Sequence, residues 1–198
     1  MATQTTLKLS LMIFVSFLYA LSPSATANTM DFIRSSCHDA LDSSACVNSL
    51  APYAWKVKES PRLLAMMALS ISAKRARETQ YFLTTVAKYP SGLSPREKAA
   101  LKDCLEVVGN TVGQLNDSIM ELRKLGRATT SAELSWRWSN VMTWVSAALT
   151  GESTCNDGFS GEAQNSELKP LIYARVSNMS MATSNALAIC HKFSSGNN

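Results

Sequence analysis

The sequence predicts an all-α protein, an up-down-up-down four-helix bundle with an N-terminal helical hairpin and two disulfides. Three observations favour this fold class. Apolar residues recur every three or four positions over long stretches, helix-start signals recur between them, and strand signals are nearly absent. The length of 198 residues, the 46% hydrophobic content and the 17% charged content fit a single globular domain rather than a disordered chain.

The N-terminal segment has the pattern of a secretory signal peptide. Lys8 supplies a weak positive charge, and an apolar stretch runs from Leu9 to Leu21. That stretch is shorter than the roughly 20 residues that a transmembrane helix needs. Ala25 and Ala27 place small residues at the −3 and −1 positions of a cleavage site. We therefore expect a signal peptide that is cut after Ala27.

Cleavage there divides the chain into a signal peptide at 1–27 and one mature domain at 28–198, with its core at about 30–193. No later segment is long and apolar enough to anchor the chain, so we expect no membrane contact after cleavage. The mature protein is predicted to be secreted and extracellular. An oxidising compartment favours disulfides between its cysteines.

The helical elements are predicted in order along the chain. Residues 29–57 indicate a short helical hairpin. Ser60 followed by Pro61 then has the pattern of an N-cap with proline at the first helical position. The basic run at 74–77 is expected to be a solvated face of this first long helix. Its apolar positions are Leu63, Met67, Ile71, Phe82 and Val86.

Three further long helices follow, each with a one-sided apolar stripe. Capping-box spacing at Ser94 and Glu97 begins the second, and the same spacing at Thr130 and Glu133 begins the third. The second stripe is Leu105, Val108, Val112, Leu115, Ile119 and Leu122; the third is Leu134, Trp138, Val141, Val145 and Ala148; the fourth is Ile172, Val176, Met179, Thr183, Ala186, Cys190 and Phe193.

Glycines and one polar segment predict where the helices end. Gly92, Gly126 and Gly151 stand where the first, second and third long helices are expected to stop. The segment 156–166 is rich in Gly, Asp and Asn and is expected to form an exposed loop. Trp136 lies off the third stripe and is the candidate surface aromatic.

All five cysteines follow the predicted cleavage site. Cys37 and Cys46 close a local loop in the hairpin. Cys104 lies early in the second helix and Cys155 just past the end of its antiparallel neighbour, so these two are expected to meet. Cys190 falls on the apolar stripe of the last helix, which predicts a buried free thiol. In the chain-entropy model the two disulfides contribute about 3 and about 4 kcal/mol.

The residues that could act in catalysis do not fall into a known catalytic motif. His38 adjoins a disulfide cysteine, and His191 adjoins Cys190 on a helix, where neighbouring side chains point apart. We expect no catalytic residues, no metal and no cofactor. The net charge of +4 is mild and lacks the dense basic patches typical of nucleic-acid binding, so no nucleic-acid partner is expected. Two N-glycosylation sequons begin at Asn116 and Asn178.

Several motifs resemble the plant invertase/pectin methylesterase inhibitor family. The most specific runs from Thr143 to Thr150 as TWVSAALT and continues from Thr154 to Phe159 as TCNDGF. CVNSL at 46–50 and SNALA at 184–188 also match. The sequence departs from the family pattern in the hairpin turn, where Ala40 replaces Thr and Asp42-Ser43 replaces Tyr-Pro.

The resemblance implies the same bundle, the same two disulfides and a secreted inhibitor that docks on a cell-wall enzyme and covers its substrate cleft. It implies contacts to pectin methylesterase, with 1:1 stoichiometry, through Thr154 and Asp157. Turn formation and capping are the alternative role for these two residues. An inhibitor of cell-wall or vacuolar invertase is the alternative function, although the Pro-Lys-Phe tripeptide of that branch is absent.

Overall fold

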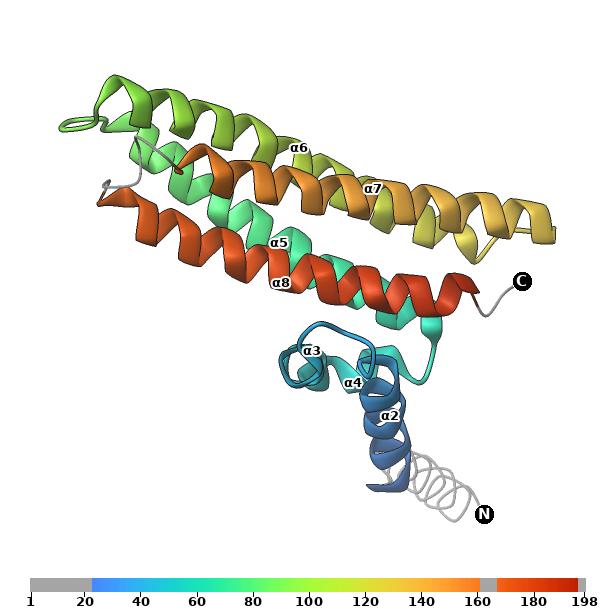
Figure 1. Ribbon diagram of the computed structural model, residues 1–198. Helices are drawn as coiled ribbons and strands as arrows, with labels where there is room; N and C mark the ends of the chain where they lie inside the picture. Colours follow the sequence, from blue (N-terminus) through green and yellow to red (C-terminus); the bar gives the residue numbers. More distant parts are fainter. Residues whose placement is uncertain (1–22, 161–166, 196–198) are drawn as a thin grey trace, which may run out of the picture.

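The computed structural model describes residues 23–160 and 167–195 (Figure 1). Four long helices dominate it. They are α5 (Pro61–Lys88), α6 (Pro95–Leu125), α7 (Ser131–Gly158) and α8 (Leu168–Ser195). Before them come α2 (Pro23–Ser36), α3 (Ser43–Leu50), a 3-10 turn (Ala51–Tyr53) and α4 (Ala54–Val57). Each long helix packs on the next, and α8 packs back on α5, which confirms the predicted four-helix bundle.

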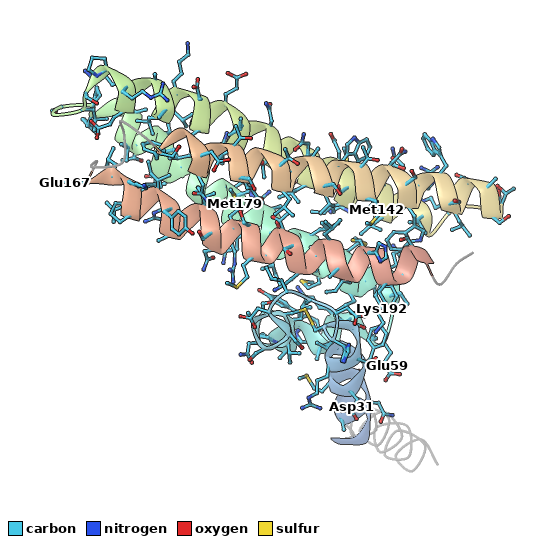
Figure 2. The ribbon with its side chains drawn as sticks, in the orientation of Figure 1. Asp31, Glu59, Met142, Glu167, Met179 and Lys192 are labelled. Carbon is cyan, nitrogen blue, oxygen red and sulfur yellow. A yellow bond between two sulfur atoms is a disulfide. The ribbon has the colours of Figure 1, made fainter. Side chains whose placement is uncertain are left out.

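The N-terminal hairpin lies at one end of the bundle, beside the last turns of α8 (Figures 1 and 2). Phe32 of α2 stacks on Phe193 of α8 with ring centroids 6.0 Å apart. Lys192 Nζ donates a hydrogen bond to the Ser35 carbonyl at 2.5 Å. Asp42, one of the departures from the family pattern, caps α3 by accepting a hydrogen bond from the Ala45 amide at 2.8 Å. The altered turn therefore has its own capping interaction.

The start of α2 differs from the predicted start of the hairpin at residue 29. The helix begins at Pro23 and so contains the predicted cleavage site after Ala27. Residues 1–22, most of the predicted signal peptide, lie outside the described residues, so the signal peptide and the boundary at residue 28 stay predictions. Among the helices that the structure describes, none combines the length and the apolar character required to cross a bilayer.

The predicted helix starts are present as capping interactions. Ser60 Oγ accepts a hydrogen bond from the Leu63 amide at 3.3 Å. Ser94 and Glu97 form a reciprocal capping box, as predicted. Thr130 caps α7, but the Glu133 carboxylate accepts from the Thr129 amide at 3.2 Å instead of closing a box with Thr130. The capping box predicted at the start of α7 is therefore wrong in detail.

The predicted stripes of α6, α7 and α8 face the core: most of their residues are buried, and the rest pack against it partly buried. Met179 lies midway along α8 (Figure 2). The stripe predicted for α5 is wrong by about one helical position. Its large apolar residues, including Met67, Ile71 and Phe82, are only half-buried. The buried face instead carries many small side chains: Ala65, Ala68, Ser72, Ala73, Ala76 and Thr79, together with Leu64, Leu69 and Leu83. Small residues let neighbouring helices approach α5 closely.

Candidate partner-binding face

Thr154 and Asp157 lie one turn apart near the C-terminal end of α7, and both side chains are exposed. Cys155 lies between them in sequence, points inward and is 2% exposed. It forms a disulfide with Cys104 near the start of α6, and the two Cα atoms are 4.4 Å apart. The covalent link therefore holds the last turns of α7 against α6 while Thr154 and Asp157 face outward.

Gly151 does not end α7, which continues to Gly158; the predicted helix stop is wrong. A Cβ atom at Gly151 would lie 3.2 Å from Thr111 Oγ1 and 3.4 Å from the Val107 carbonyl oxygen of α6. Thr111 also donates a hydrogen bond to the Ala148 carbonyl at 3.3 Å. Gly151 thus serves a close approach of two helices rather than chain reversal. Cys155 consequently lies inside α7 and not past its end.

A buried carboxyl group lies behind the same turn. Glu152 is fully buried, and Thr183 Oγ1 of α8 lies 2.7 Å from its Oε1. Ser72 Oγ of α5 is 2.6 Å from the Thr183 hydroxyl, so three helices meet in this network. Desolvation raises the pKa of Glu152 to about 7, although hydrogen bonds from Thr183 and Ser180 act in the opposite direction.

Sequence reasoning overlooked Glu152. A signal was available, because Glu152 continues the stripe Val141, Val145 and Ala148 towards Cys155 at helical spacing. A carboxyl group on an apolar stripe is either buried with partners or neutral.

Neither Thr154 nor Asp157 caps a helix with its side chain. The Thr154 hydroxyl donates to the Thr150 carbonyl at 3.0 Å, within α7. The Asp157 carboxylate has no hydrogen-bond or ion-pair partner among the described residues, and it lies at the C-terminal end of a helix, where the dipole disfavours a negative charge. Its main-chain carbonyl does accept from Ser160. The local fold thus uses the Asp157 backbone carbonyl, while its carboxylate is exposed.

The outward face of α7 is rich in hydroxyl groups and uncharged over a long stretch. Thr143, Thr150 and Ser153 are exposed, and each hydroxyl donates to the carbonyl four residues earlier. Each hydroxyl hydrogen is thus used within the helix, while each hydroxyl oxygen can still accept a hydrogen bond. Trp136 extends the same helix face and is 59% exposed, as predicted.

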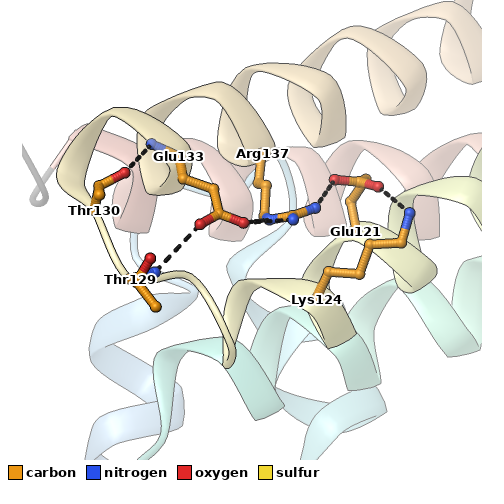
Figure 3. Close-up of polar contacts among 6 residues, drawn as sticks. All are labelled: Glu121, Lys124, Thr129, Thr130, Glu133 and Arg137. Atoms are coloured by element: carbon orange, nitrogen blue, oxygen red, sulfur yellow. Dashed lines mark hydrogen bonds and ion pairs between the residues drawn. The ribbon is translucent and has the colours of Figure 1, made fainter.

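Charged side chains fix the opposite end of α7 at the turn from α6 (Figure 3). Arg137 bridges Glu121 at 3.0 Å and Glu133 at 2.6 Å, and Lys124 binds the other oxygen of Glu121 at 2.7 Å. Desolvation raises the pKa of Glu121, but hydrogen bonds from Lys124 and Arg137 outweigh it and lower the pKa below its ordinary value. Both ends of α7 are therefore tied to α6, by ion pairs and by a disulfide.

The remaining cysteines lie as the sequence predicts. Cys37 and Cys46 form a disulfide with Cα atoms 5.7 Å apart. Cys190 is a fully buried free thiol, and desolvation raises its pKa to about 12. A thiol that stays protonated is a poor nucleophile, so Cys190 acts as a small apolar side chain. No cluster of metal-ligating side chains occurs within residues 23–160 and 167–195.

Both sequon asparagines lie on exposed helix positions beside arginines of α5. Asn178 Oδ1 accepts from Arg75 Nη1 at 2.6 Å, and Asn116 Oδ1 accepts from Arg77 Nη1 at 3.3 Å. Their side-chain nitrogens, to which a glycan would attach, have no hydrogen-bond partner among the described residues. Glycosylation of either residue stays a prediction.

The described residues form a helical bundle that is held by two disulfides and has an exposed, hydroxyl-rich face on α7. Comparison with known proteins gives its family: the model of the plant invertase/pectin methylesterase inhibitor family matches residues 31–189, and the chain belongs to this family. The family description names inhibitors of enzymes.

Individual relatives agree with this assignment. Pectinesterase inhibitor 9 of Arabidopsis thaliana is 42% identical over 187 residues and covers 92% of each chain. Pectinesterase inhibitor 11 of the same plant is 38% identical over 83% of this chain and 81% of its own, and the 21 kDa protein of Daucus carota is 36% identical over 93% and 94%. The fold is similar to the crystal structure of a mutant pectin methylesterase inhibitor from Arabidopsis, with a TM-score of 0.63, 21% identity and coverage of 78% and 92%.

Proposed function

We propose that this protein is a secreted inhibitor of plant pectin methylesterase that binds the enzyme 1:1 and covers its pectin-binding cleft. The observation that carries the proposal is the similarity, over 83 to 92% of this chain, to two proteins named pectinesterase inhibitors, at 38 and 42% identity. Secretion rests on the predicted signal peptide, and the extracellular cell wall is the compartment in which such an enzyme would be met.

The contact is proposed to centre on the C-terminal turns of α7. Thr154 would offer a hydrogen-bond acceptor and Asp157 an unpaired carboxylate, which suits a basic or amide-donating group of the enzyme. The Cys104–Cys155 disulfide and the close approach at Gly151 fix these groups before binding. A rigid face loses little conformational entropy when it docks, which favours tight association.

Titration of a plant pectin methylesterase with the mature protein, residues 28–198, tests this function. Methanol release from pectin at mildly acidic pH is expected to fall to zero near one equivalent of inhibitor. A parallel titration of invertase, followed by glucose release, is expected to show no effect. Inhibition of invertase alone would replace the proposed target with the second enzyme that the family description names. No inhibition of either enzyme at micromolar concentration would refute the inhibitor function.

A further inference from the structure

A groove between α5 and α8 is lined by cationic and exposed aromatic side chains. These side chains take no part in the proposed inhibitor contact. Two adjoining open hollows share Glu78 and Arg175, and the larger has a volume of about 580 Å³. We call this the α5–α8 groove. The lining residues that matter here are Lys74, Arg75, Arg77, Tyr81, Leu171 and Arg175.

The groove carries four cationic side chains and one carboxylate, Glu78. None of Arg75, Arg77 and Arg175 lies within ion-pair distance of a carboxylate in the part of the chain that the structure describes. Lys74 meets Glu78 only at 3.8 Å on an exposed helix face, a weak pairing. The uncompensated positive charge therefore favours an anionic ligand.

Two of these guanidinium groups are already positioned. Arg175 lies over the Phe82 ring, with its central carbon 4.1 Å from the ring centroid. Arg75 is anchored to Asn178 by hydrogen bonds to its main-chain and side-chain oxygens. A stacked guanidinium keeps its planar edge available for a carboxylate, which it binds through two parallel N–H groups. A carboxylate is therefore one anion that suits this groove.

Shape and apolar surface narrow the choice of ligand further. The groove follows α5 from Lys74 to Thr85, a length of roughly 16 Å at the helical rise. Tyr81 lines it and is 77% exposed, and Leu171 is 54% exposed. An exposed tyrosine gives a flat apolar surface against which a sugar ring can pack. A linear polymer of sugar rings that carry carboxylates has groups for both: the carboxylates for the cationic side chains and the ring faces for Tyr81.

We propose that the α5–α8 groove binds a stretch of de-esterified pectin, a polymer of uronic acid residues. This choice of ligand rests on the proposed function, because removal of methyl groups by pectin methylesterase exposes these carboxylates. In the bundle, α5 packs on α6 and α8 but stands diagonally opposite α7. The groove and the outward face of α7 therefore lie on different sides, and polymer and enzyme can be bound at the same time.

Binding of polygalacturonate oligomers to the full mature protein tests the inference, with highly methyl-esterified pectin and polyglutamate as comparison polymers. The groove variant is Arg77→Gln/Arg175→Gln. The matched control is Arg123→Gln/Arg127→Gln, which removes two exposed arginines at the turn from α6 to α7. Circular dichroism checks that each variant is folded.

The wild type is expected to bind polygalacturonate, more weakly as salt rises, and to prefer it to both comparison polymers. The groove variant should bind at least about tenfold more weakly, and the control should stay within about twofold of wild type. Tyr81→Ala should also weaken binding. Equal losses in the two arginine variants, equal affinity for polyglutamate, or no binding by the wild type would each overturn the inference. Inhibition of pectin methylesterase by the groove variant is expected to be unchanged, so a failure here is distinguishable from a failure of the proposed function.

Discussion

Glu152 places a carboxyl group in the interior of the bundle, where its ionised form is costly. Its Oε1 faces Thr183, while its Oε2 has no hydrogen-bond partner among the described residues. Burial of the charged form is the reason that its pKa rises from 4.5 to about 7. The folded protein therefore holds a proton at Glu152 that the unfolded chain releases above about pH 4.5.

This residue gives a pH dependence of stability with a defined sign. The folded state binds more protons than the unfolded state between pH 4.5 and about 7, so the free energy of unfolding falls as pH rises through that window. The full effect is about 3 kcal/mol, from a pKa shift at 1.36 kcal/mol per unit. Urea unfolding at pH 4.5, 6 and 7.5 measures it. Glu152→Gln should flatten the dependence, while Glu106→Gln, at an exposed site, should keep it. An unchanged slope in Glu152→Gln would contradict this assignment.

At the scale of the element, α7 combines a core face, a close contact with α6 and an exposed hydroxyl face. Gly151 permits the close contact, because even a Cβ atom would lie 3.2 Å from Thr111 Oγ1. Gly113 of α6 provides a contrast, since a Cβ atom there would meet nothing within 4 Å. The two glycines have the same intrinsic effect on helix formation but different surroundings.

Leucine substitutions at Gly151 and Gly113 separate the effect of close helix packing from the effect of helix propensity. Gly151→Leu should destabilise the protein by about 1 to 3 kcal/mol, because the side chain forces α7 away from α6. Gly113→Leu should leave stability unchanged or raise it by up to about 0.8 kcal/mol, through higher helix propensity. Thermal or urea unfolding of both variants measures the difference. Equal stability of the two variants would show that Gly151 has no special packing role.

The elements differ in how far the sequence predicts them. The stripes of α6, α7 and α8 contain large apolar residues, so their buried faces follow from spacing alone. The buried face of α5 does not, because Ala68, Ala76 and Thr79 are poor markers of burial next to the larger but only half-buried Met67 and Phe82. Gly151 was predicted as a helix stop because a close contact between helices depends on the partner helix, which local sequence does not reveal.

At the scale of the whole molecule, the C-terminal end of α7 is held to α6 by a disulfide and exposes Thr154 and Asp157. The predicted disulfide partners meet because antiparallel helices bring the start of α6 beside the end of α7. The exposure of Thr154 and Asp157, and the absence of a local partner for the Asp157 carboxylate among the described residues, were not predictable without the packing. These features support the proposed docking face over a role in turn formation.

The inhibition constant of Thr154→Ala/Asp157→Ala against pectin methylesterase tests the central claim most directly. Its matched control is Thr84→Ala/Asp31→Ala. Thr84 is an exposed α5 threonine with the same hydroxyl bond to the carbonyl four residues earlier, and Asp31 belongs to an exposed surface ion pair. With folding intact in both, we predict that the first variant inhibits about tenfold more weakly or worse than wild type, and that the control inhibits like wild type. Unchanged inhibition by Thr154→Ala/Asp157→Ala would contradict the account.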